Sequence, residues 1–324
     1  KPVSVPDYVG FCVAFCPLYE ERLRSERAMN RKPDFICPGL PKAGTTTLHR
    51  MLERHPDFRM PPVKEIKYLN DFQADVPAPR IRCLSGNHTF ARQDRVALVH
   101  AAGRMARLQD PAYTLRATTL YFFAPVVSDR WYTGLFARDR ISGDITPGYF
   151  SLDSDAVHAW AQRFPDRRIV LLLRHPVWRH WSHLRMARPD LTERSSGVTG
   201  LQILRRRLAH LSGRVGTYAD LVRRWRRYFG SQNVFVGFFD DMVSDSRAFW
   251  RDLFRFLGGR HDEATVDGVV EVAGSPANAR GPANVPDTLK PDLQAAACRE
   301  LFGFDDLYPD RARAWFDDPV MGDV

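Results

Sequence analysis

The chain has 324 residues, of which 44% are hydrophobic and 26% are charged, so it is long and apolar enough to bury a sizeable core. This composition excludes a chain that is disordered throughout. Its apolar runs are also too short to supply the ~18 residues that a membrane-spanning helix needs. The net charge of +9 favours an anionic partner, of which nucleic acid is one candidate.

Residues 1–32 are predicted to form an N-terminal extension, and residues 33–324 a single domain. The chain begins with Lys1 rather than Met, so the sequence leaves open a targeting segment that has been removed. Within the domain, less regular segments near 71–139 and 189–216 are expected to wall the substrate site, because such connections lie at the mouth of an α/β sheet.

The cysteine and lysine content bears on the compartment. Five cysteines are scattered through the chain without metal-ligand spacing, which favours buried thiols in a reducing compartment. Only six of the 47 basic residues are lysines, which indicates a GC-rich genome. A bacterial cytoplasm is therefore the expected location, with a trimmed Golgi-lumen domain as the alternative. The oligomeric state is left open.

Strands that alternate with helices begin at Pro33. Strands are expected at 35–37, 169–173 and 234–239, and the helices that follow them end near 55, 186 and 257. A further helix near 292–302 is expected to pack back on the same domain. This order predicts a P-loop-type, three-layer α/β/α fold with a central, mainly parallel sheet.

The segment after the first strand reads Gly39-Leu40-Pro41-Lys42-Ala43-Gly44-Thr45-Thr46-Thr47-Leu48. A loop between a strand and a helix points successive backbone N–H groups at one place, where a phosphate can bind. The segment differs from the nucleoside-triphosphate loop GxxxxGK[ST], because Thr45 follows the second glycine and Lys42 lies inside the loop.

This difference bears on the class of reaction. A kinase needs Mg²⁺ held by a hydroxyl after the lysine and by an acidic residue that ends a nearby strand. Here the strand at 169–173 ends in Arg174. A metal-free site that binds phosphate with cations fits better, although an ATP-dependent small-molecule kinase stays the enzymatic alternative. The histidines at 175, 180 and 183 lack the partners that zinc needs, so no metal is expected.

The loop resembles the PKxGTT loop of sulfotransferases that use 3′-phosphoadenosine 5′-phosphosulfate (PAPS). A second signature of that family is similar to Leu173-Arg174-His175-Pro176-Val177-Trp178-Arg179-His180-Trp181-Ser182. The resemblance is greatest to the heparan-sulfate-type and bacterial branch, and it extends from about Asp34 to Trp315. It implies that the donor's 5′-phosphosulfate is held by Lys42, Ala43, Gly44, Thr45, Thr46 and Thr47, and its 3′-phosphate by Arg174 and Ser182. A loop with Arg280 and Gly281 would close on the nucleotide.

The segment Lys64-Glu65 resembles one whose glutamate is the base in heparan-type enzymes, which implies that role for Glu65. Pro61 and Pro62 favour an extended entry that returns this segment to the strand-end cleft. Asp144 and His49 are the next candidates for the proton. Lys64, Asp144 and Tyr149 are further expected near the acceptor. The heparan-type motif EKTPAYF has a lysine that Asp144-Ile145-Thr146-Pro147 lacks, which argues against a sugar-sulfate acceptor.

The predicted activity is therefore metal-free, in-line transfer of a sulfuryl group from PAPS to a hydroxyl or amine of a small-molecule or glycan acceptor. Lys42 would steady the departing phosphate. The arginine runs at 205–207 and 223–227 lie in stretches with helical periodicity, so solvated helix faces are expected rather than a nucleic-acid surface. A non-enzymatic nucleotide-binding or nucleic-acid-binding protein is the remaining alternative.

Overall fold

The computed structural model describes residues 32–69, 111–123, 128–192, 198–273 and 285–322. The chain divides into two compact units. The larger consists of residues 34–60, 64–74 and 140–324, and the smaller of 1–33, 61–63 and 75–139. The expected extension at 1–32, apart from its last residue, lies outside the described residues, as do Arg280 and Gly281. The domain boundaries stay predictions.

A parallel sheet of four strands forms the centre of the larger unit, in the order β2-β1-β3-β4. Each strand pairs with its neighbours in parallel, which confirms the expected mainly parallel sheet. The longest strand is buried over nearly its whole length, as a strand covered on both faces must be. The strands are β1 (Phe35–Gly39), β2 (Gly143–Ile145), β3 (Arg168–Leu173) and β4 (Val234–Phe238).

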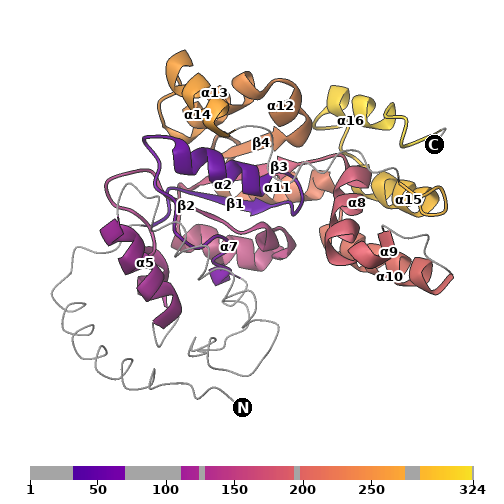
Figure 1. Cartoon of the computed structure of the whole chain (residues 1–324), viewed down its shortest axis with the longest axis horizontal. Helices are drawn as coiled ribbons and strands as arrows, with labels where there is room; N and C mark the ends of the chain where they lie inside the picture. The colour runs from indigo at the N-terminus through magenta and orange to yellow at the C-terminus, as the bar shows by residue number, and fades with distance from the viewer. Residues whose placement is uncertain (1–31, 70–110, 124–127, 193–197, 274–284, 323–324) are drawn as a thin grey trace, which may run out of the picture. The chain divides into compact units, whose positions relative to one another are not determined.

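Helices cover both faces of this sheet. Phe235 of β4 contacts Phe249, whereas Phe238 of the same strand contacts Phe304 and Trp315. Residues three apart in a strand point to opposite faces, so the helix that carries Phe249 lies opposite the C-terminal region. This arrangement confirms the three-layer α/β/α fold, and Figure 1 shows α13 and α14 above the strands and α7 below them.

The helix bounds agree with the expected alternation. The helices of the larger unit are α2 (Thr45–Arg54), α7 (Ser154–Arg163), α8 (Pro176–Ala187), α9 (Pro189–Thr192), α10 (Val198–Val215), α11 (Tyr218–Phe229), α12 (Phe239–Ser244), α13 (Ser246–Leu257), α14 (Glu263–Ala273), α15 (Lys290–Leu301) and α16 (Pro309–Phe316), with 3₁₀ turns at η1 (Pro147–Ser151) and η2 (Ser231–Asn233).

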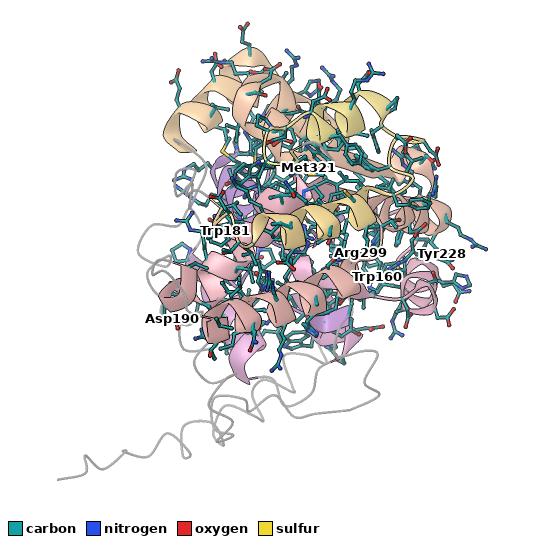
Figure 2. All side chains as sticks on the ribbon, turned by 90° about the vertical axis from the view of Figure 1, so that its right-hand side faces the viewer. Trp160, Trp181, Asp190, Tyr228, Arg299 and Met321 are labelled. Carbon is teal, nitrogen blue, oxygen red and sulfur yellow. The ribbon has the colours of Figure 1, made fainter. Side chains whose placement is uncertain are left out.

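The C-terminal region packs on the larger unit through α15, as the sequence predicts. A buried apolar cluster joins α8, α10 and α15 and includes Trp181, Leu208, Leu293, Ala297 and Met321. Trp181 and Met321 both lie beside α15 in Figure 2. This packing connects the start of α8, where the second sequence signature lies, with the last residues of the chain.

The described part of the smaller unit contains α5 (Pro111–Phe123) and α6 (Asp129–Gly134). The indole Nε1 of Trp131 donates to the carbonyl of Leu120 at 2.8 Å, which joins the two helices. The sequence predicts a less regular segment near 71–139 and does not predict α5. The apolar residues of α5 are spread around its axis rather than gathered on one face, so they give no helical periodicity. None of the described helices is both long and apolar enough to cross a membrane.

Candidate active site

The carboxyl ends of all four parallel strands lie at one edge of the sheet, and the candidate residues follow these ends. The loop after β1 enters α2 through Gly44, whose φ of 94° suits glycine. A Cβ there would lie 3.0 Å from the side chain of Met242. Gly44 has no side chain to cap α2, and backbone amides at a helix N-terminus can bind an anion, so the start of α2 is suited to a phosphate.

Arg174 follows β3 and reaches this loop. Its guanidinium donates to the carbonyl of Lys42 at 3.2 Å and lies 4.3 Å from the centre of the Phe239 ring. The Tyr218 hydroxyl donates to the carbonyl of Arg174 at 2.9 Å. Burial lowers the pKa of Arg174, and Asp240 counteracts that effect. Guanidinium groups stay charged in proteins, so the loop and Arg174 form one cationic site.

The Lys64-Glu65 segment meets the loop on its other side. The ammonium group of Lys64 donates to the Thr46 hydroxyl at 3.0 Å and lies 3.5 Å from that of Thr45. It is 3.8 Å from a carboxylate oxygen of Glu65, whose side chain is 43% exposed. Burial lowers the pKa of Lys64. The structure therefore places Lys64 at the hydroxyls of Thr45 and Thr46, with the carboxylate of Glu65 beside Lys64.

Backbone bonds hold this segment in an unusual conformation. Glu65 and Lys67 have φ values of 62° and 61°, which side-chain-bearing residues seldom adopt. The amide of Glu65 donates to the carbonyl of Ile145 at 3.2 Å, and that of Lys67 to the Thr146 hydroxyl at 3.3 Å. Residues at sparsely populated backbone angles persist where their surroundings hold them in place, and they cluster at active sites.

Asp144 and Tyr149 lie in the core beneath this segment. The carboxylate of Asp144 has no exposed surface and accepts hydrogen bonds from Thr146 at 2.6 Å and from Tyr149 at 2.8 Å. The amide of Leu69 donates to the Tyr149 hydroxyl at 3.4 Å. Tyr149 and Thr146 thus contact the backbone that follows Glu65, and Asp144 holds both of their hydroxyls, so the burial of Asp144 and Tyr149 favours a positioning role over acceptor contact.

A buried ionic network supports α8, and sequence reasoning missed it. Glu300 of α15 has no exposed surface and binds the guanidinium of Arg179 at 2.7 Å and Nε2 of His180 at 2.5 Å. Arg179 also donates to the Tyr218 hydroxyl at 2.9 Å, which in turn holds Arg174. The sequence offered only two signals, a glutamate at position 300 and an arginine within the second signature.

The remaining candidates lie close to these groups or outside the described residues. Ser182 is partly buried on α8. His49 is buried on α2, 3.4 Å from Glu53. Burial and then Arg207 lower the pKa of His183 to about 4, so its ring is neutral at pH 7.

The other two histidines of the second signature serve the fold. Nδ1 of His175 accepts from the amide of Val177 and caps α8, while its Nε2 lies 2.9 Å from the carbonyl of Trp315. His180 binds Glu300. Among the described residues, no group of three histidine, cysteine or acidic side chains is placed to hold a metal ion.

Both arginine runs lie on helices, α10 and α11, as their periodicity predicts. Several of these arginines have protein partners. Arg205 pairs with Asp292, Arg223 with Asp306, and Arg226 donates to the Tyr308 hydroxyl. These contacts connect the two helices to the C-terminal region.

Comparisons with known proteins point to one family. A model described as the sulfotransferase family matches residues 33–263. The structure resembles that of a sulfotransferase from Alicyclobacillus acidocaldarius, with 22% identity, 88% of this chain and 99% of that chain covered, and a TM-score of 0.53. Sulfotransferase STF9 from Mycobacterium avium has 16% identity, 92% and 81% coverage, and a TM-score of 0.51. A search of curated proteins found no match.

Proposed function

The chain belongs to the sulfotransferase family, and from this premise we propose that it moves a sulfuryl group from PAPS to a hydroxyl or amine of an acceptor. Adenosine 3′,5′-bisphosphate would be the second product. The observation that carries this proposal is the position of Arg174 against the backbone of Lys42, with a contact of 3.2 Å. It puts a bidentate cation beside a phosphate-type loop, as a donor with phosphates at both ends requires.

The reaction needs alignment and charge stabilisation more than covalent help from the protein. The acceptor oxygen or nitrogen would form the new bond to sulfur as the bond from sulfur to the bridging phosphate oxygen breaks. Lys42 would neutralise the charge that develops on that phosphate oxygen, and the first amides of α2 would hold the 5′ side. Lys64 would keep the hydroxyls of Thr45 and Thr46 oriented.

Glu65 would accept the proton that the acceptor loses. Its partial exposure leaves the carboxylate open to an acceptor, whereas Asp144 and His49 are buried. The ammonium group of Lys64 lies 3.8 Å from that carboxylate. Asp144 and Tyr149 would fix the backbone of the Glu65 segment. The resemblance implies that a loop with Arg280 and Gly281 would close on the nucleotide of the donor.

Adenosine 3′,5′-bisphosphate is expected to raise the melting temperature of the protein, and EDTA is expected to leave that rise unchanged. A ligand that binds only the native state stabilises it by about 2.7 kcal/mol at 100 times its Kd. Differential scanning fluorimetry with and without EDTA measures this effect. Stabilisation by ATP with Mg²⁺ and none by the bisphosphate would favour a kinase and overturn the proposal.

Arg174→Ala is expected to weaken donor binding by about 1.5–3 kcal/mol, the loss of a charge-assisted hydrogen bond, and Ser182→Ala by less. Titration calorimetry with adenosine 3′,5′-bisphosphate measures both. Arg206→Ala on the exposed face of α10 is the matched control and should bind normally. An unchanged Kd in folded Arg174→Ala protein would refute the 3′-phosphate assignment.

The acceptor is best identified directly. Incubation of the protein with labelled PAPS and a panel of small molecules and glycans, read as a mass gain of one sulfuryl group, tests the reaction and the substrate together. Because the arginine-rich composition favours a bacterial source, small molecules from bacterial extracts are the first acceptors to test.

A further inference from the structure

Two carboxylates follow β4 at the same sheet edge as Arg174. Asp240 directly follows Phe239, whose ring lies 4.3 Å from the guanidinium of Arg174. A carboxylate at an anion site is unfavourable in two ways, because it repels a phosphate and competes with it for the arginine. The site therefore needs a means of keeping Asp240 from Arg174.

The C-terminal helix α16 supplies groups that bind Asp240 instead. The indole Nε1 of Trp315 donates to Oδ2 of Asp240 at 2.6 Å, and Arg311 lies 3.7 Å from the same oxygen. Arg311 also forms a close ion pair with Asp241 and lies over the Phe238 ring at 4.6 Å. Both carboxylates after β4 are thus occupied by residues of α16.

Trp315 is held firmly enough to fix Asp240. Its side chain is only 3% exposed, and its ring stacks on Phe304 with centroids 5.4 Å apart and planes inclined by 8°. Its carbonyl lies 2.9 Å from Nε2 of His175, the residue that follows Arg174. The backbone and the indole of Trp315 therefore connect the residue after Arg174 with the start of α12.

Because Trp315 and Arg311 bind Asp240, the guanidinium of Arg174 can bind a ligand. Its contacts are the ring of Phe239 and the carbonyl of Lys42, and among the described residues no carboxylate is hydrogen-bonded to it. A partly buried guanidinium with no bonded anion has a strong tendency to acquire one.

We propose that Trp315 and Arg311 are positioning residues that hold Asp240 away from Arg174, so that Arg174 can bind a phosphate of the donor. This inference rests on the proposed function. Trp315 and Arg311 both lie beyond residue 263, where the family match ends, so the contacts that hold Asp240 come from the C-terminal region of this chain.

The test is a double-mutant cycle on adenosine 3′,5′-bisphosphate binding, measured by titration calorimetry on the full chain. Trp315→Phe removes the indole N–H and keeps an aromatic ring, and it is expected to weaken binding about tenfold as Asp240 turns to Arg174. Adding Asp240→Asn to Trp315→Phe is expected to restore most of the affinity. A merely structural role for Trp315 predicts no such rescue.

Trp178→Phe is the matched control. The indole of Trp178 donates to Asp318 at 3.0 Å, so this change also removes one indole bond to a carboxylate, but not a bond to Asp240. Its affinity should match that of the wild type. If Trp315→Phe does not fold, Arg311→Gln with and without Asp240→Asn provides the same cycle with the same expected signs.

Wild-type affinity in Trp315→Phe, or a double variant as weak as the single one, would overturn the inference. Arg174→Ala separates this failure from that of the proposed function. If Arg174→Ala weakens binding while Trp315→Phe does not, only the positioning role fails. If neither variant changes the Kd, the donor site itself is misassigned.

Discussion

Replacing Glu65 with glutamine is expected to lower kcat by about 10²–10⁴-fold and to leave the Kd for adenosine 3′,5′-bisphosphate unchanged, because glutamine keeps the shape and removes the basicity. The position of Glu65 supports this expectation. Its neighbour Lys64 bonds to Thr46 of the phosphate loop, and its own carboxylate is open to solvent. The measurement is turnover of an acceptor from the panel at saturating donor.

Glu53→Gln is the matched control for this variant. Glu53 is a glutamate near the C-terminal end of α2, 3.4 Å from His49, and the same change there should leave kcat near the wild-type value. Near-normal turnover of Glu65→Gln at saturating acceptor would contradict the assignment and pass the role to Asp144 or His49. Loss of donor affinity in the variant would instead indicate that Glu65 helps to hold the loop.

Replacing Glu300 with alanine is expected to destabilise the protein by about 3–5 kcal/mol, because it leaves the buried charge of Arg179 without its partner. Neither Glu300 nor His180 has any exposed side-chain surface, so water cannot replace the lost contacts. Burial and then Arg179 lower the pKa of His180, and its hydrogen bond with Glu300 counteracts them. Urea unfolding followed by tryptophan fluorescence measures the change in free energy.

Asp292→Ala provides the comparison for Glu300→Ala. Asp292 lies on the same helix and pairs with Arg205 at the surface, where an ion pair contributes about 0–1 kcal/mol. If both variants lose a similar free energy of unfolding, the buried Glu300 network contributes no more stability than the surface ion pair of Asp292. Donor affinity in Glu300→Ala then reports whether the network also supports Arg174 through Tyr218.

The same network predicts a pH dependence. Burial by itself raises the pKa of Glu300, but Arg179 and the hydrogen bond with His180 outweigh it, so the pKa lies below its ordinary value. A lowered carboxylate pKa contributes stability that is present above the unfolded value, about 4.3, and is lost as the pH falls through the folded value. The wild type should therefore lose stability in acid more steeply than Glu300→Ala. Parallel acid curves would contradict this.

The sequence by itself determined the features that depend on local chain geometry. The positive φ at Gly44 suits glycine, and a loop between a buried strand and a helix aims its amides at one point, so ten residues were enough to predict a phosphate site there. Strands that alternate with helices imply a parallel sheet. Since parallel strands end at one edge, the meeting of Arg174 with Lys42 could also be expected, although they are 132 residues apart in the chain.

Only the tertiary structure decided which side chains are buried and what they bind. The sequence predicts Asp144 to lie near the acceptor. In the structure Asp144 is buried in the core, because the short strand β2 that carries it pairs with β1. Glu300 and Trp315 contact α8 and the β4 end across 121 and 75 residues. No local periodicity encodes such contacts, since they arise from the packing of distant helices and from the need to satisfy every buried charge.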